Sequence, residues 1–175
     1  MYKPNTEEFA LLKNGEWRND PELKKNMREK KLDLFQAYLT EADLAGACLA
    51  EAYLCKANLY RACLLGASLY KACLRGVILA EADLREADLR EADLTEACLE
   101  GAYLCKANLY GANLREANLR EANLIRANLA EAIIDKNNFD KYIDKSIWSF
   151  EIIYNDIVKI VEIMQFKKRK ESENE

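Results

Sequence analysis

The sequence predicts an all-β solenoid: a right-handed, quadrilateral parallel β-helix of about 5.5 coils, with short N-terminal helices and a C-terminal α-helix as caps. Two regularities lead to this fold. A leucine recurs at every fifth residue from Leu34 to Leu129 without an insertion, and Ile134 and Phe139 continue the series. Alanine stands two positions before these residues from Ala37 to Ala132, with Val77 as the exception.

The period of five decides between helix and strand. Ala, Leu, Glu and Arg all favour helices, but leucines at every fifth position would point to all sides of a helix and form no stripe. In an extended segment, residues two apart face the same side. Alanine and leucine therefore point inward together, and the remaining two residues of each repeat turn the chain. A turn of about 90° per repeat closes a four-sided coil after four repeats, and parallel crossovers are almost always right-handed.

The repeat motif resembles that of a known family. The runs EADLREADLREADL at 81–94 and GANLREANLREANL at 111–124 are similar to the A-(D/N)-L-x-x signature of pentapeptide repeat proteins. This resemblance covers positions 32–141 and implies a right-handed quadrilateral β-helix. It also implies one known function, because the best-known branch of the family mimics DNA, binds DNA gyrase and protects it from quinolones. Tyrosine or cysteine replaces Asp or Asn at Tyr38, Cys48, Tyr53, Cys63, Cys73, Cys98 and Tyr103.

Residues 1–31 are expected to form an N-terminal helical cap. Asn5 with Glu8 is typical of a capping box, and the helix that it opens should end at Asn14–Gly15. Asp20–Pro21 then starts a second helix that runs to about Lys31. A solenoid exposes its core at its ends, so four apolar side chains are expected to cover the first coil: Phe9, Leu12, Trp17 and Leu23.

A C-terminal helix is expected over 142–168, followed by a disordered tail at 169–175. Its apolar residues gather on one broad face, which exceeds what one cap needs and indicates packing on the last coil and possible homodimerisation. Charged residues in this segment exclude a membrane span. The candidate contact residues are Phe150, Ile153, Tyr154, Ile157, Ile160, Val161 and Met164.

Charge alternates in sign from coil to coil. Residues 20 apart should stack, and this stacking places Glu41–Arg61–Glu81, Glu51–Lys71–Glu91 and Glu86–Lys106 in columns, where opposite charges help to set the register. The coil at 81–100 is the most acidic and is a candidate interaction surface. Its acids form a ring: Glu81, Asp83, Glu86, Asp88, Glu91, Asp93, Glu96 and Glu100.

Tyr60, Tyr70 and Tyr110 occupy the first turn position and complete the candidate surface. They could anchor a partner or cover the stems of neighbouring side chains. The nonamer AYLCKANLY occurs at 52–60 and again at 102–110, a shift of 2.5 coils that puts the copies on opposite faces. This pattern indicates duplication during repeat growth rather than a bivalent site.

The six cysteines are expected to be free thiols. No two stand in the same column, and the nearest pair on one face, Cys55 and Cys73, should lie roughly 8 Å apart, beyond the limit of about 7 Å for a disulfide. The absence of C-x-x-C spacing argues against zinc, and no cofactor is expected. The chain has no histidine, so the usual general base is missing.

A non-enzymatic scaffold or protein-interaction module with an unknown partner fits these features best. A DNA-mimicking gyrase-binding protein is the alternative. An enzyme is not expected, because nothing supplies a nucleophile with a base. The net charge of −4 selects no partner, and direct nucleic-acid binding is not expected. The segment 1–15 is charged and polar and lacks the apolar stretch of a signal peptide, so the expected location is cytoplasmic.

Overall fold

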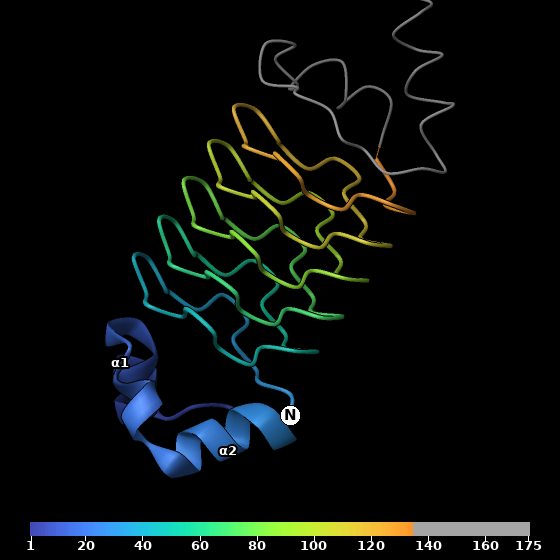
Figure 1. Ribbon diagram of the computed structural model, residues 1–175. Coiled ribbons are helices and arrows are strands. Elements are labelled where there is room, and N and C mark those ends of the chain that lie inside the picture. Colours follow the sequence, from blue (N-terminus) through green and yellow to red (C-terminus); the bar gives the residue numbers. More distant parts are fainter. Residues whose placement is uncertain (135–175) are drawn as a thin grey trace, which may run out of the picture.

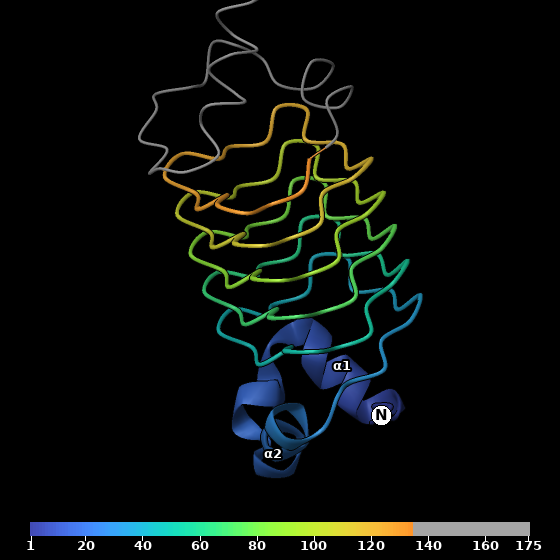
Figure 2. The same ribbon diagram turned by 90° about the vertical axis from the view of Figure 1, so that its right-hand side faces the viewer.

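The computed structural model describes residues 1–134. In this part of the chain, residues 33–134 wind into a four-sided stack of about five coils, and the two N-terminal helices lie against its first coil (Figures 1 and 2). The last repeats at 135–141, the helix expected at 142–168 with its candidate contact residues, and the tail at 169–175 lie outside the described residues.

Adjacent coils pair at one constant register. Parallel bridges join each outward residue to the one 20 positions on, from Asp33 with Tyr53 to Asn113 with Ile133. The backbone pairs the coils in both directions: the N–H of Leu59 donates to the carbonyl of Ile78 at 2.7 Å, and the N–H of Ile78 donates to the carbonyl of Ala57 at 2.9 Å. One such bridge occurs on each side of each coil, which makes the cross-section four-sided.

The interior is a column of leucine and alanine. The repeat leucines from Leu34 to Leu114 are at most 2% exposed, and the alanines from Ala42 to Ala117 are at most 1% exposed. Val77 replaces one alanine and is also fully buried. Burial of one leucine side chain contributes about 1.5–3 kcal/mol before entropy is subtracted, so this column supplies the main stabilisation of the stack.

A two-residue turn follows every buried leucine. The N–H of the next alanine donates back to the carbonyl of the leucine three residues earlier, at 3.0 to 3.2 Å. The second turn residue has a positive φ of 55° to 69° at every repeat position from Gln36 to Glu131, as in a type II β-turn. These positions hold Gly, Glu, Lys, Arg or Gln and never a β-branched residue, for which this conformation is strained.

The residue before each leucine fixes the start of the turn. Where this residue is Asp or Asn, its side-chain oxygen accepts the backbone N–H two residues on; Asn58 does so from Tyr60 at 3.0 Å. This local bond is the usual way in which Asp and Asn stabilise a turn. It recurs at Asp33, Asp43, Asp83, Asp88, Asp93, Asn108, Asn113, Asn118, Asn123 and Asn128.

Three short helices precede the stack: α1 (Thr6–Asn14), the 3-10 helix η1 (Glu16–Asn19) and α2 (Pro21–Glu29). The capping box of Asn5 and Glu8 is present at the start of α1, and Gly15 ends the helix with a φ of 80°. Asp20 accepts the N–H of Leu23, and Pro21 lies in the first turn of α2. Local signals in the sequence therefore mark where both α-helices begin.

The N-terminal segment supplies hydrogen-bond partners to the first coil. The N–H of Asp33 donates to the carbonyl of Tyr2 at 2.7 Å, and the N–H of Asp43 donates to the carbonyl of Lys13 at 3.0 Å. The side chains of Leu12 and Leu23 are 0% exposed under this coil. Backbone groups that would otherwise form an open edge are thus paired by α1 and the segment before it.

Gly46 tests the turn requirement. No atom lies within 4 Å of a Cβ added at Gly46, yet its φ is +69°. We expect Gly46→Val to lower the free energy of unfolding by about 1–2 kcal/mol, because the backbone conformation alone disfavours it. Urea denaturation followed by circular dichroism measures the change. Gly46→Asn is the control and should stay within about 0.5 kcal/mol, because Asn tolerates this conformation. Equal stability of the two variants would contradict the turn assignment.

Candidate interaction surface

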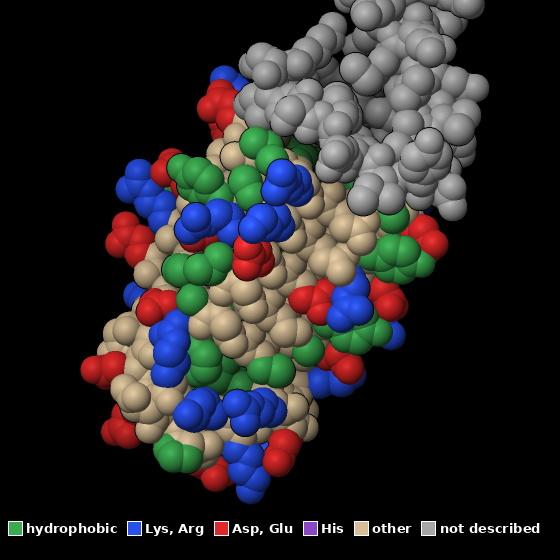
Figure 3. All heavy atoms as spheres, in the orientation of Figure 1, with side chains coloured by type: hydrophobic (Ala, Val, Ile, Leu, Met, Phe, Trp, Pro, Cys, Tyr) green, Lys and Arg blue, Asp and Glu red, His purple; other side chains and the backbone are tan. Residues whose placement is uncertain are grey.

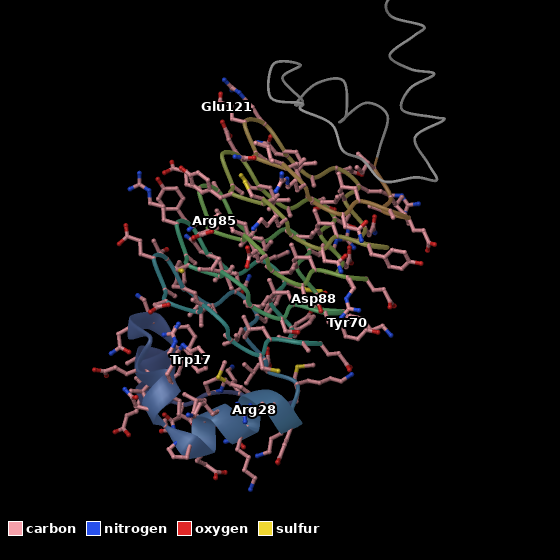
Figure 4. All side chains as sticks on the ribbon, in the orientation of Figure 1. Trp17, Arg28, Tyr70, Arg85, Asp88 and Glu121 are labelled. Carbon is pink, nitrogen blue, oxygen red and sulfur yellow. A yellow bond between two sulfur atoms is a disulfide. The ribbon has the colours of Figure 1, made fainter. Side chains whose placement is uncertain are left out.

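The acidic ring at 81–100 encircles one coil rather than forming a face. Its eight acids come from successive repeats, and therefore from all four sides of the stack. On the face shown in Figure 3, acidic and basic side chains are interspersed along the stack. Figure 4 shows Asp88 beside Tyr70 on one side of the stack, with Arg85 on another.

Five acids of the ring pair with a cation on a neighbouring coil. Glu81 binds Arg61 at 2.8 Å, Glu91 binds Lys71 at 3.4 Å, and Glu96 binds Arg75 at 2.8 Å, all from the coil below. On the coil above, Lys106 lies 3.0 Å from Glu86 and Arg120 lies 3.9 Å from Glu100. Of the predicted column neighbours, Arg61–Glu81, Lys71–Glu91 and Glu86–Lys106 are therefore confirmed as ion pairs. Glu41–Arg61 and Glu51–Lys71 form no ion pair in the described part of the chain, and Glu51 binds Lys31 instead.

The other three acids find partners within their own repeat or beside it. Arg85 and Arg90 each bind the aspartate two residues earlier, Asp83 and Asp88, through two hydrogen bonds of 2.7 and 2.8 Å. Asp93 accepts hydrogen bonds from the hydroxyl of Thr95 at 2.5 Å and the amide of Asn113 at 3.4 Å. Every acid of the ring thus has a partner.

These contacts lower the pKa values of several ring acids. The hydrogen bond from Arg61 holds the pKa of Glu81 below its usual value, with a second contribution from the hydroxyl of Tyr60. Hydrogen bonds from Arg85 and Arg90 do the same for the pKa values of Asp83 and Asp88, against the opposing effect of partial burial. The carboxylates are therefore ionised and neutralised in place at neutral pH. These pairs are exposed and screened by solvent, so each adds little stability.

The three candidate tyrosines are also engaged within the chain. The hydroxyl of Tyr60 donates to Glu81 at 3.1 Å, while Arg61 lies 5.0 Å from the centre of its ring. Tyr70 repeats this arrangement: its hydroxyl donates to Glu91 at 3.2 Å, with Lys71 at 5.0 Å and Arg90 at 5.4 Å from its ring. A hydrogen bond to Glu131 raises the pKa of Tyr110. A cation lies over the ring of Tyr60 and over the ring of Tyr70. Less of each ring is therefore accessible to a partner protein.

More exposed aromatic side chains lie elsewhere, at outward or first-turn positions outside the candidate set. Tyr38 is 75% exposed and Phe35 is 45% exposed. Phe35 stacks on Tyr53 of the next coil, with ring centres 5.5 Å apart. We call Phe35, Tyr38 and Tyr53 the aromatic corner. The aromatic corner could have been predicted from the sequence, because each of its residues is aromatic at a position where other repeats carry Asp, Asn, Ala or Arg.

One expectation about the cysteines is wrong. Cys55 and Cys73 form a disulfide between adjacent coils, with Cα atoms 5.5 Å apart. The larger separation that was expected treated the strand as extended through Cys55, but the chain already turns there, because the N–H of Ala57 donates to the carbonyl of Leu54 at 3.0 Å. Four cysteines are free thiols, as expected: Cys48, Cys63, Cys98 and Cys105.

Among the described residues, no group of three or more Cys, Asp or Glu side chains is placed to hold a metal ion. An open hollow of about 550 Å³ lies at the N-terminal helices and is lined by Leu11, Glu16, Asn19, Asp20, Pro21 and Glu22. Its lining pairs no nucleophile with a base.

Within residues 1–134, neither α-helix is long and apolar enough to cross a bilayer.

The family comparison matches most of the stack. A family model described as pentapeptide repeats matches residues 37–76, 74–104 and 107–141, in eight copies. No curated protein matches the sequence.

Several solved structures are similar to this chain over part of its length. A pentapeptide repeat protein from the thylakoid lumen of Arabidopsis thaliana is 26% identical, covering 67% of this chain and 77% of its own, with a TM-score of 0.47. Rfr23, a pentapeptide repeat protein from the cyanobacterium Cyanothece 51142, is 39% identical over 55% of this chain and 62% of its own, with a TM-score of 0.35. QnrB1, a plasmid-mediated fluoroquinolone resistance protein, is 19% identical over 58% and 60%, with a TM-score of 0.24.

The ion pair between Arg18 and Asp43 predicts a pH dependence. Hydrogen bonds from Arg18 lower the pKa of Asp43 from its ordinary value of 3.8. A lowered folded-state pKa means that the stabilisation is complete above the unfolded value and is lost as pH falls through the folded value. We therefore expect Asp43→Asn to reduce the urea midpoint at about pH 6 and to make a smaller difference at about pH 2.5.

Asp33→Asn is the control for this experiment. Asp33 also accepts a backbone N–H in its turn, at 3.2 Å from Phe35, and an asparagine keeps that acceptor. Its effect on the midpoint should be small at both pH values. A deficit of Asp43→Asn that is the same at both pH values would contradict the role given to Arg18.

Proposed function

The chain belongs to the pentapeptide repeat family, and we propose that it is a non-enzymatic scaffold that binds a protein partner on the outside of its stack. One observation carries this proposal: each acid of the ring at 81–100 is paired with a cation or a hydrogen-bond donor of its own or an adjacent coil. The polar surface thus serves the register of the coils. What remains for a partner is the shape of the stack and its exposed apolar side chains.

The aromatic corner is the surface that we assign to the partner. Tyr38 is 75% exposed, and Phe35, which precedes it by one turn of the chain, stacks on Tyr53, so that two more partly exposed rings are added. Aromatic side chains of this kind contribute much of the binding energy in protein interfaces. The tyrosines of the original candidate set, Tyr60 and Tyr70, instead lie under Arg61 and Lys71, so we give them a structural role.

The gyrase-binding alternative is less well supported. A protein that imitates DNA needs a continuous acidic face, because the phosphate backbone dominates recognition of DNA. Here the acids encircle the coil, and each acid that forms an ion pair lies beside its Lys or Arg partner. Paired carboxylates would have to lose Arg61, Lys71 or Arg75 before they could face a basic DNA-binding groove.

Several finer expectations remain part of this proposal. We propose that the coil is right-handed, as the family implies, and that the helix expected at 142–168 covers the last coil and joins two chains. We also retain the cytoplasm as the proposed location. The aromatic corner depends on none of these.

Two sets of variants test the proposed surface. The protein is immobilised and its partner is recovered from an extract of its source cells by crosslinking. We expect Phe35→Ser with Tyr38→Ser to reduce recovery at least about ten-fold, because exposed aromatic anchors contribute about 1–2 kcal/mol or more each. The matched set, Glu86→Gln with Glu100→Gln, should recover the partner at the wild-type level. Loss with the second set and not with the first would overturn the assignment.

A supercoiling assay tests the alternative. We expect DNA gyrase to retain its activity, with and without a fluoroquinolone, when the wild-type protein is added at micromolar concentrations. A gyrase-binding pentapeptide repeat protein of known activity serves as the positive control. Inhibition or drug protection at these concentrations would contradict the scaffold proposal and favour DNA mimicry.

A further inference from the structure

The duplicated nonamer AYLCKANLY occupies two different settings. In the first copy, at 52–60, Cys55 forms a disulfide with Cys73 of the next coil. In the second copy, at 102–110, Cys105 is a free thiol. The residue that stands to Cys105 as Cys73 stands to Cys55 is Asn123. The same local sequence is therefore bonded on one face and free on the opposite face.

The lysine of the nonamer also has different surroundings in the two copies. Lys106 of the second copy binds Glu86 of the coil below at 3.0 Å. Below Lys56 lies Gln36, and no ion pair of Lys56 is found within residues 1–134. Its side chain instead lies near Gly76 of the coil above, where a methyl group built on Gly76 would be 3.6 Å from the Cγ of Lys56. Lys56 directly follows Cys55 in the sequence and is exposed, so this cation lies on the side of the stack that holds the disulfide.

The two cysteines of the disulfide also differ in exposure. Cys55 is 7% exposed, whereas Cys73 is partly exposed. Tyr53, which lies in the column directly below Cys73, stacks on Phe35. Of the two cysteines, Cys73 is thus the more exposed one to an external thiolate, and an exposed cation, Lys56, is adjacent to Cys55 in the sequence.

We propose that Cys55 and Cys73 form a thiol–disulfide exchange site for small anionic thiols of the glutathione class. A thiolate attacks the Sγ of Cys73, the bond to Cys55 breaks, and Cys55 leaves as a thiolate. A second thiolate then attacks the sulfur of the bound thiol, which releases a small-molecule disulfide and the thiolate of Cys73. The protein disulfide gains two electrons, two thiols become one disulfide, and water supplies the protons that the new thiolates take up. The oxidised form of the same small molecule reverses both steps.

This assignment goes beyond the scaffold function and does not rest on it. It fits the proposed cytoplasmic location, because stable structural disulfides are rare in a reducing compartment. The bond joins coils that backbone hydrogen bonds already hold together, such as the N–H of Leu54 with the carbonyl of Cys73 at 2.8 Å. Reduction therefore removes a link without removing the fold. The site reacts once per chain in each direction and needs no base.

The first test counts and traps thiols in the full chain. The oxidised protein should show four titratable thiols and the reduced protein six. A background that carries Cys48→Ser, Cys63→Ser, Cys98→Ser and Cys105→Ser isolates the pair. After equilibration in mixtures of reduced and oxidised glutathione, alkylation and mass spectrometry should find chains with no label or two labels. In this background, a large population with a single label, or two labels under every condition, would overturn the proposal.

Single variants in the same background test which sulfur is attacked. Cys55→Ser leaves the partly exposed Cys73 alone, and we expect it to take up one glutathione from the oxidised form. Cys73→Ser leaves Cys55, which we expect to react at least about ten-fold more slowly, because thiol reactivity follows exposure. Equal rates would contradict the assigned direction of attack. Circular dichroism of both variants checks that the fold is intact.

Lys56 provides a test that a purely structural disulfide would not pass. We expect Lys56→Gln to slow reduction by glutathione about five-fold, the effect of one close charge in water, and to change reduction by uncharged 2-mercaptoethanol little. Arg126→Gln is the matched control, because Arg126 occupies the same turn position on the opposite face. If Lys56→Gln has no effect, or slows reduction by both thiols equally, Lys56 has no part in binding the anionic thiol and this element of the site is wrong.

The second nonamer tests the geometry. We expect Asn123→Cys to form a disulfide with Cys105 on air oxidation, because this change recreates the spacing of the first copy. The new bond should be reduced more slowly by glutathione than the native one, since both nearby cations are neutralised: Glu86 holds Lys106, and Asp83 holds Arg85, which stands where Phe35 stands in the first copy. Failure of Asn123→Cys to form the bond would show that the spacing alone does not place two thiols together, and would contradict the geometric basis of the site.

Discussion

The two-residue turn after each buried leucine is the constraint on which the rest of the structure depends. Its second residue has a positive φ in every described repeat, and its closing hydrogen bond brings the next alanine back toward the core. Four such turns make one coil, so residues 20 apart stack. The buried column, the charge pairs and the disulfide all follow from this stacking. A repeat one residue shorter or longer would place none of these groups together.

Much of the fold could be predicted because it is carried by spacing. The interval between Leu34 and its successors excludes an amphipathic helix, and the family model now confirms the repeat. Stacking also predicted the pairs of Arg61 with Glu81 and Lys106 with Glu86. The signals at Asn5 and Pro21 are local, and α1 and α2 begin there.

Other features depend on backbone angles that spacing alone does not give. The distance expected between Cys55 and Cys73 assumed an extended strand, and the turn at Cys55 shortens it to 5.5 Å. The absence of β-branched residues at the second turn position reflects the requirement for a positive φ, but the period of five alone does not predict that backbone angle. The partners of Asp83 and Asp88 were also missed, because each lies two residues away in the same repeat rather than in a column.

The same stacking limits what the surface can do. Acids and cations that hold the register face one another, so the most acidic coil has no free carboxylate at its ring positions among the described residues. Positions outside the columns of opposite charge are left for recognition and reactivity. The aromatic corner and the Cys55–Cys73 pair both lie there, on the coils nearest the N-terminal helices.

Long-range nuclear magnetic resonance couplings across hydrogen bonds measure the register between coils most directly. In a protein labelled with ¹⁵N and ¹³C, the N–H of each buried leucine should couple to a carbonyl of the next coil, as Leu59 with Ile78 and Leu79 with Cys98. Couplings to carbonyls at another spacing, or to carbonyls one helical turn earlier as in an α-helix, would contradict the stacking and everything built on it.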